Sequence, residues 1–336
     1  MAIRVTHFGL GPIGCAVARQ VAQHQGLKIV GGIDIDSSKV GKDVGELAGL
    51  SSKLGVQVAE DALAVLNGTK SDVVILCTSS SLDEVLPQIE TVLKMRVPII
   101  STTEELSYPL LANRNNALKI DELAKQAKVA VLGTGINPGF LMDTLPITLS
   151  GVCSQVDSIE IDRVQDAGKR RLPFQLKIGA GLTREQFLKK VETRKVGHVG
   201  LRESMAMIAR AFGWELQRVT DVVEPKITMT GVSTEFLTVD PGCVCGIVQR
   251  GVGYRNGIPV ITLRFDAALG NIESYDAVRI NGSPSLSMKI DGGVPGDIGT
   301  ASIIVNSIPK VIAASPGLQT MLDLPIPSCL SVGTSL

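Results

Sequence analysis

A glycine-rich loop near the N-terminus has the residue types and spacing of a phosphate-binding turn. Residues 9–14 read Gly-Leu-Gly-Pro-Ile-Gly, between a predicted strand and a predicted helix. Glycines at these positions allow a tight turn, backbone approach to a pyrophosphate and close packing of the helix on the sheet. The helix N-terminus adds free N–H groups and the positive end of its dipole. We predict dinucleotide contacts at Gly9, Gly11, Pro12, Ile13 and Gly14.

An acidic residue follows the second predicted strand, as a dinucleotide site requires. Asp34 lies about 20 residues after Gly14, where a carboxylate can accept hydrogen bonds from ribose hydroxyls and would repel a 2′-phosphate. Asp36 could do the same or face solvent in a turn. Ser37, Ser38 and Lys39 could instead hold a phosphate. These residues favour NAD as the cofactor, with NADP as the alternative.

Three further segments follow later strands of the predicted sheet. They are 77–81, 101–106 and 133–140. Ligands of open α/β sheets lie beyond the carboxyl ends of the strands, so these segments should converge near the nicotinamide. We predict that small polar side chains line the cofactor there, at Cys77, Thr78, Ser79 and Thr102.

The adjacent pair Glu104-Glu105 has two interpretations. One carboxylate could be a general base or proton shuttle, with a pKa tuned by burial and a neighbouring charge. Alternatively, both could stabilise the N-terminus of a helix capped by Thr102 or Thr103. The residues alone favour the second interpretation. Asn137 could likewise cap a helix, or bind the nicotinamide or the substrate.

The second half of the chain offers several polar candidates. Arg163 and Gln165 alternate on a predicted strand and should share one face, from which Arg163 could clamp a carboxylate bidentately. His198, just before a predicted helix, is slightly more typical of a structural histidine than of a ligand. The glycine-rich segment 292–300 could close over a ligand or simply connect two elements.

Rival chemistries are weaker. Cys153 could be the nucleophile of a semialdehyde dehydrogenase with His198 as its base, but a buried inert cysteine fits better. Cys243 and Cys245 have the wrong spacing for a usual zinc pair, and the chain has three histidines. We predict no metal site.

Composition limits the class of protein. A chain of 336 residues favours about two domains, and 33 Lys and Arg balance 33 Asp and Glu. This balance argues against a nucleic-acid or anionic-membrane surface. Apolar runs fall far short of about 20 residues, so no membrane span is expected. We expect no signal peptide, and six scattered cysteines are typical of reduced thiols in a cytoplasmic protein.

The elements that must position these residues alternate in the first part of the chain. Predicted strands and helices follow one another as βαβ units, which imply a parallel sheet covered on both faces. The predicted strands are 4–8, 27–33, 72–77, 98–101 and 129–132, and the predicted helices are 14–25, 81–94 and one that includes 120–126.

After about Gly139 the chain becomes richer in alternating strands, which indicates an antiparallel or mixed sheet. The predicted strands are 158–165, 226–229, 235–239, 246–254, 260–265, 275–280 and 285–290, and the predicted helices are 184–193, 201–212 and 300–312. The fold class is therefore α/β: an N-terminal Rossmann-type parallel sheet, a second α+β domain, and a C-terminal helix that could return to the first domain. We predict a dinucleotide-binding domain over 1–138, a substrate and dimerisation domain over 139–299, and a C-terminal helix and tail over 300–336.

Taken together, several segments resemble the 2,4-diaminopentanoate dehydrogenase family, which includes native amine dehydrogenases. The matching segments keep their order over nearly the whole chain: residues 9–14, 34–47, 101–109, 133–146, 163–171, 197–204 and 292–309. The family resembles dihydrodipicolinate reductase in architecture. This chain lacks the His-His and Lys-rich substrate motif of that enzyme and has residues 163–171 in its place, which argues against dipicolinate chemistry.

The resemblance implies NAD(P)-dependent oxidative deamination of 2,4-diaminopentanoate or a related amine to a ketone and ammonia, with reductive amination as the reverse. It places the catalytic carboxylate on Glu104, and so reverses the interpretation from the residues alone. Substrate-side roles fall on Asn137, Phe140, Arg163, Gln165, His198 and Thr300, with Arg163 and His198 anchoring a substrate carboxylate. The resemblance also implies a homodimer. The alternatives are an imine or semialdehyde reductase and a non-catalytic NAD sensor.

Overall fold

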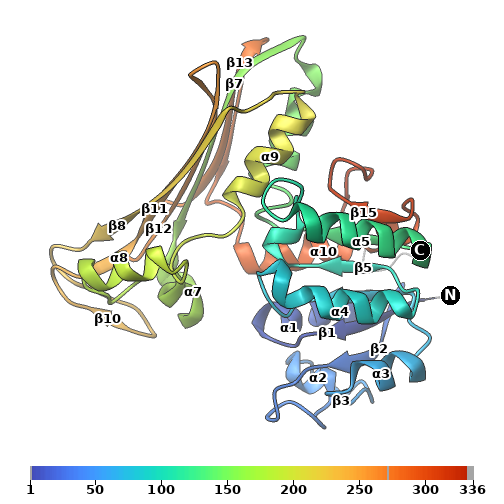
Figure 1. The fold of residues 1–336 in the computed structure, drawn as a ribbon. Coiled ribbons are helices and arrows are strands. Elements are labelled where there is room, and N and C mark those ends of the chain that lie inside the picture. Colours follow the sequence, from blue (N-terminus) through green and yellow to red (C-terminus); the bar gives the residue numbers. More distant parts are fainter. Residues whose placement is uncertain (1, 271, 331–336) are drawn as a thin grey trace. The chain divides into compact units, whose positions relative to one another are not determined.

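A computed structural model describes residues 2–270 and 272–330 (Figure 1). The chain divides into two compact units, each described by itself. The first comprises the described residues of Met1–Phe140 and Pro295–Leu336, and the second comprises those of Leu141–Val294.

The first unit is built on a parallel sheet. Within the described residues the strand order is β15-β6-β5-β4-β1-β2-β3, and every neighbouring pair is parallel. The chain reverses its direction of winding at β1, which has β4 on one side and β2 on the other. The strands are β1 (Ile3–Phe8), β2 (Leu27–Ile33), β3 (Val58–Ala59), β4 (Val73–Leu76), β5 (Ile99–Ser101), β6 (Ala130–Gly133) and β15 (Gly317–Gln319).

Helices cover both faces of this sheet. Strand residues and helices α3, α4 and α5 share one buried cluster on one face, while α1 and α10 pack against each other over the other face (Figure 1). Because α10 contacts β4, β5 and β6, the C-terminal helix returns to the first unit. The helices are α1 (Pro12–Gln23), α2 (Val44–Leu47), α3 (Ala62–Gly68), α4 (Leu82–Lys94), α5 (Arg114–Ala127) and α10 (Gly296–Ile312), with a 3₁₀ turn η1 (Glu104–Leu106).

The second unit is a mixed sheet. Its strand order in the described residues is β14-β13-β7-β12-β11-β8, in which β7 and β12 are parallel and the other neighbours are antiparallel. The strands are β7 (Gln155–Asp166), β8 (Arg218–Ile227), β11 (Val244–Arg255), β12 (Ile258–Ala268), β13 (Tyr275–Ser283) and β14 (Leu286–Asp291), with a separate ribbon of β9 (Val232–Ser233) and β10 (Thr238–Val239).

Helix α9 packs on one face of the second sheet, against β8, β11 and β12. Residues of β7 that point to this face, such as Ile159 and Ile161, are buried, whereas Glu160 and Asp162 are half-buried on the other face. The helices and 3₁₀ turns of the second unit are α6 (Thr144–Leu149), η2 (Ser150–Val152), η3 (Ala167–Lys169), α7 (Leu172–Lys177), α8 (Arg184–Glu192) and α9 (Leu201–Ala211).

Two predicted strands were wrong in extent. The strand predicted over 226–229 is β8, which begins at Arg218 and ends at Ile227. The strand runs through Pro225 because β8 is an edge strand, where a proline is tolerated. Of the strand predicted over 235–239, only Thr238–Val239 is extended in the described structure.

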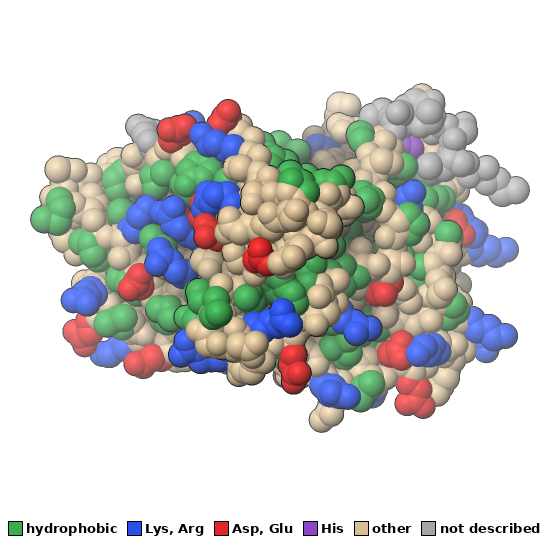
Figure 2. Space-filling view, turned by 90° about the horizontal axis from the view of Figure 1, so that it is seen from above, with side chains coloured by type: hydrophobic (Ala, Val, Ile, Leu, Met, Phe, Trp, Pro, Cys, Tyr) green, Lys and Arg blue, Asp and Glu red, His purple; other side chains and the backbone are tan. Residues whose placement is uncertain are grey.

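On the face shown in Figure 2, basic and acidic side chains are interspersed, in keeping with their equal numbers. Among the described residues, no helix combines the length and the apolar character that crossing a membrane would require.

Candidate active site

The glycine loop joins the end of β1 to the start of α1, as predicted. Gly9 has a φ of +95°, and a Cβ there would lie 2.5 Å from the Cys77 carbonyl oxygen. A Cβ on Gly14 would lie 2.0 Å from the Gly9 carbonyl oxygen, whereas one on Gly11 would meet no heavy atom of the described residues within 4 Å. Packing therefore requires the outer two glycines, and the middle one leaves room for a ligand beside the N-terminus of α1.

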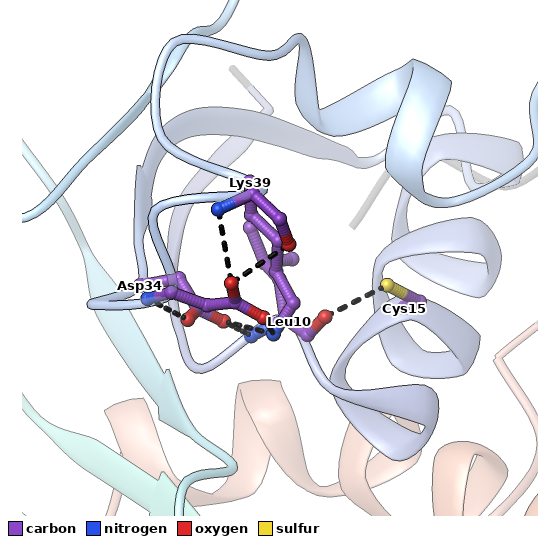
Figure 3. Close-up of polar contacts among 6 residues, drawn as sticks. Leu10, Cys15, Asp34 and Lys39 are labelled. Carbon is purple, nitrogen blue, oxygen red and sulfur yellow. Dashed lines mark hydrogen bonds and ion pairs between the residues drawn. The ribbon is translucent and has the colours of Figure 1, made fainter.

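Asp34 directly follows β2 and is held against this loop (Figure 3). Its Oδ2 accepts from the Leu10 amide at 2.8 Å, and its Oδ1 accepts from the Asp36 amide at 2.9 Å. Burial opposes its charge, but these two amides and the Lys39 ammonium outweigh burial and lower the pKa of Asp34. The side chain is thus a fixed, ionised hydrogen-bond acceptor.

Lys39 pairs with both acidic residues after β2. Its Nζ lies 3.0 Å from Asp34 Oδ2 and 3.3 Å from Asp36 Oδ2. Asp36 itself is exposed in a turn, where its Oδ1 accepts from the Ser38 hydroxyl at 2.7 Å. The sequence did not indicate this pairing, because an ion pair across a turn leaves no periodic pattern.

The loops after β4 and β5 are joined by small polar side chains. The Ser101 hydroxyl donates to the Leu76 carbonyl oxygen at 3.0 Å, and the Thr103 hydroxyl donates to the Ser79 carbonyl oxygen at 2.8 Å. Beyond β5, the Thr134 amide donates to the Ser101 carbonyl oxygen at 2.9 Å. The three loops predicted to converge are therefore linked at one edge of the sheet.

The remaining predicted cofactor residues lie in the same loops. Thr78 donates to Gln88 at 2.5 Å, Ser79 bonds Glu84, and the Thr102 amide donates to the Leu76 carbonyl oxygen. Burial raises the pKa of the Cys77 thiol to about 12, despite the neighbouring Thr102 hydroxyl. The Cys77 thiol is therefore neutral at pH 7.

The structure shows different surroundings for Glu104 and Glu105. Both lie in η1, a single 3₁₀ turn, so the α-helix considered for them is absent from these described residues. The Glu105 Oε2 accepts from the Leu82 amide at 2.8 Å, at the first residue of α4. Glu105 thus satisfies the N-terminus of another helix, in keeping with the structural interpretation. Glu104 lies three residues after the end of β5, at the first position of η1, and is half-buried.

Three other predicted residues lie in the first unit. Asn137 is buried and Phe140 half-buried in the segment after β6. Thr300 lies in the first two turns of α10, and its Oγ1 accepts from the Ile136 amide at 3.4 Å. Asn137 does not cap a helix: the next helix, α6, begins at Thr144 behind Asp143.

In the second unit, Arg163 and Gln165 share the buried face of β7. Arg163 Nη1 donates to Asp276 at 2.7 Å and Nη2 to the Val294 carbonyl oxygen at 2.9 Å, while Gln165 Nε2 donates to that oxygen at 3.3 Å. Burial lowers the pKa of Arg163 although Asp276 opposes this effect. Two nitrogens that a bidentate clamp could use are therefore bonded within the unit.

His198 lies above the same sheet. Its ring stacks on Phe265, with 4.8 Å between centroids. The Gln249 side chain accepts from the His198 amide at 2.7 Å and donates to its carbonyl oxygen at 3.0 Å. Burial, with the charges of Lys177 and Arg163, lowers the pKa of His198 to about 3, so its imidazole is neutral at pH 7. No local sequence signal pointed to Gln249 or Phe265, because strand register brings them there.

Comparisons with known proteins show which proteins this chain resembles. Residues 140–335 match the family model of the 2,4-diaminopentanoate dehydrogenase C-terminal domain, and residues 3–133 match that of the dihydrodipicolinate reductase N-terminus. The chain is 35% identical to 2,4-diaminopentanoate dehydrogenase of Acetoanaerobium sticklandii, over 98% of this chain and 95% of that protein. It is 25% identical to an amine dehydrogenase of Streptomyces virginiae, over 95% of each.

Two solved structures share the fold of this chain. The structure of an amine dehydrogenase from Mycobacterium smegmatis matches with a TM-score of 0.87 and 26% identity, over 98% of this chain and 97% of that one. Dihydrodipicolinate reductase from Paenisporosarcina sp. TG-14 shares the fold, with a TM-score of 0.55 and 15% identity over 96% and 99% of the two chains.

The predicted fold class, family and enzyme class, an oxidoreductase acting on CH–NH₂ donors, are thereby confirmed. A nicotinamide dinucleotide is the class of cofactor that fits the first unit, in which the glycine loop and Asp34 lie at the carboxyl edge of a parallel sheet. With a family model matching most of its length and a relative 35% identical across nearly all of it, the chain belongs to the 2,4-diaminopentanoate dehydrogenase family.

Proposed function

We propose that this protein is an NAD-dependent amine dehydrogenase that deaminates 2,4-diaminopentanoate or a related amine, with Glu104 as its catalytic carboxylate. The observation that carries the proposal is the order β5-β4-β1. Glu104 follows β5, the cofactor-lining loop 77–79 follows β4, and the glycine loop follows β1. With neighbouring strands about 4.8 Å apart, the first and last lie about 10 Å apart along one edge. That spacing suits a dinucleotide whose pyrophosphate and nicotinamide lie over different strands.

The cofactor, when bound, supplies the hydride acceptor. Loss of hydride from the amine-bearing carbon gives an iminium ion, and addition of water followed by loss of ammonia gives the ketone. Glu104 first takes a proton from the substrate ammonium group, because only the neutral amine can lose hydride to give the iminium ion, and passes that proton to solvent. It then takes a proton from the attacking water and returns it to the nitrogen, which leaves as ammonia while the new hydroxyl group loses its proton to form the ketone. Glu105 is assigned no catalytic role, because its carboxylate is bonded to the start of α4.

NAD is proposed over NADP because Asp34 is ionised and fixed where the ribose hydroxyls would bind. The other cofactor contacts proposed are those predicted from the sequence, in the loops after β1, β2, β4 and β5. The substrate-side roles implied by the resemblance stay predictions, for Asn137, Phe140, Arg163, Gln165, His198 and Thr300. The homodimer and the cytoplasmic location also stay predictions.

The test is NAD reduction with 2,4-diaminopentanoate, compared between Glu104→Gln and Glu105→Gln. Both variants remove one negative charge from the same turn. We expect Glu104→Gln to lower kcat at least 100-fold, within the range for general acid–base catalysis, while the Kd for NAD stays within threefold. Glu105→Gln keeps an oxygen acceptor for the Leu82 amide and should retain more than a third of wild-type kcat.

Two results would contradict the proposal. Near-normal turnover by folded Glu104→Gln would remove the catalytic assignment. Failure of the wild type to oxidise any of a panel of amines, or to aminate any of a panel of ketones with ammonia, would remove the function.

A further inference from the structure

Lys39 occupies a position where it competes with a ribose for Asp34. A carboxylate oxygen has two acceptor positions. Among the described residues, the Leu10 amide and Lys39 Nζ fill both positions on Oδ2, and the Asp36 amide fills one on Oδ1 (Figure 3). One position on Oδ1 remains for a ribose hydroxyl. A second hydrogen bond to the ribose requires the ammonium group of Lys39 to leave Oδ2.

The ammonium group therefore lies close to the 2′ position of a ribose bound by Asp34. A hydroxyl oxygen bonded to Asp34 lies about 2.8 Å from the carboxylate oxygen that it contacts. Lys39 Nζ lies 3.0 Å from Oδ2. A hydroxyl on the free position of Oδ1 and the ammonium group on Oδ2 contact the same carboxylate, so the two groups lie beside each other, within reach of a flexible lysine stem.

Charge makes this proximity important. Asp34 and Asp36 would oppose the two negative charges of a 2′-phosphate, and Lys39 offsets one of the two carboxylates. The side chains of Lys39 and Asp34 are 23% and 9% exposed, so water screens their charges less than it screens fully exposed ions. A lysine ammonium on a flexible stem can also exchange a carboxylate partner for a phosphate partner.

We propose that Lys39 sets how strongly this protein discriminates between NAD and NADP, by lowering the repulsion that Asp34 and Asp36 exert on a 2′-phosphate. The inference rests on the dinucleotide binding of the proposed function. It makes Lys39 a specificity-determining residue and predicts that the wild-type protein binds NADP measurably, although less tightly than NAD.

The test measures Kd by titration calorimetry for NAD and NADP, and for the fragments ADP and 2′,5′-ADP. The fragment pair isolates the adenosine end and needs no catalysis. Lys39→Met should raise the ratio of Kd for NADP to Kd for NAD at least tenfold, and the fragment ratio in parallel. Lys39→Arg keeps the charge and should leave both ratios within threefold of wild type.

Two more variants complete the design. Lys42→Met removes the same charge from an exposed position three residues further along the same loop, and it should leave both ratios within threefold. Asp36→Asn removes a carboxylate that holds Lys39, so it should lower the ratios at least threefold. Because Asp36→Asn should lower the Kd ratios that Lys39→Met should raise, it tests the role of Lys39 even if Lys39→Met fails to fold.

The inference is overturned if the ratios stay within threefold of wild type in both Lys39→Met and Asp36→Asn, or if Lys42→Met changes them as much as Lys39→Met does. Absence of any dinucleotide binding by the wild type would instead overturn the proposed function along with it. Binding without amine oxidation would contradict the proposed function but leave the role of Lys39 intact.

Discussion

At the scale of single residues, the partner of each polar group decides what chemistry it has left. Glu105 has the same charge as Glu104, yet its carboxylate already accepts the amide at the start of α4. Arg163 has the charge to bind a carboxylate, yet two of its nitrogens bond Asp276 and Val294. Charge and residue type made these side chains candidates, and the hydrogen bonds of Glu105 and Arg163 show that both have structural partners.

Gln249 offers a test of how His198 is positioned. It is 2% exposed, and besides its two bonds to the His198 backbone it donates to Asp221 Oδ1 at 2.9 Å. Gln249→Met has similar length but would leave these groups without this partner. An unsatisfied buried polar group costs about 1–3 kcal/mol, so we expect that loss of stability in urea unfolding, with a rise of at least fivefold in KM for the amine.

The matched control is Arg250→Met, on the exposed opposite face of β11, which should change neither quantity appreciably. If Gln249→Met lowered stability but left KM unchanged, Gln249 would have only a structural role, and the substrate role predicted for His198 would lose its support.

At the scale of elements, the turn from β1 to α1 contains one glycine that we expect to matter for stability and another that we expect to matter for cofactor binding. Gly14→Ala would place a Cβ 2.0 Å from the Gly9 carbonyl oxygen, so the backbone must move. Overpacking of this kind costs about 1–3 kcal/mol. Gly11→Ala meets open space at an ordinary φ of −69°. Its stability should stay within about 0.5 kcal/mol of wild type, while its Kd for NAD should rise at least tenfold.

Thermal unfolding and calorimetric titration of the two variants distinguish these effects. Unchanged NAD binding by Gly11→Ala would mean that the pyrophosphate does not approach this glycine, and the assignment of the loop would fail.

Elements with a strong local pattern could be predicted from the sequence. Strand β2 has the predicted bounds, and α4 begins one residue after its predicted start, because apolar runs and periodicity are local signals. Strand β15 follows α10 and is only three residues long. It was missed because so short a segment has little periodicity and forms by pairing with β6. Helix α3 was missed for the same reason of length.

The candidate site was predictable where residues act within one turn of chain. The glycine loop belongs to this class. Asp34 was predictable from its spacing after that loop, because consecutive parallel strands β1 and β2 pair with each other. Contacts made through sheet register do not. Gln249 and Phe265 reach His198 because β11 and β12 pair side by side, and Asp276 reaches Arg163 because β13 pairs with β7. A single sequence carries no local signal for these pairings.

At the scale of the whole molecule, each unit contains a histidine whose pKa is lowered so that its ring is neutral at pH 7, and this should make the protein sensitive to acid. His7 in β1 is 0% exposed, and its ring nitrogens have no hydrogen-bond partner among the described residues. Burial lowers its pKa to about 4, and burial with nearby positive charges lowers that of His198 in the second unit to about 3. Protonation of either ring is therefore more favourable in the unfolded chain.

The sign of the pH dependence follows from this difference. Between the ordinary histidine pKa of about 6.5 and the lowered value, the unfolded chain binds a proton that the folded chain does not, so the free energy of unfolding falls as the pH falls. At 1.36 kcal/mol per pKa unit, His7 alone accounts for about 3 kcal/mol between pH 6.5 and 4. His7→Leu should remove that part of the slope in urea unfolding measured from pH 7.5 to 4.5. Equal slopes in wild type and His7→Leu would show that His7 is not the group whose protonation weakens the fold.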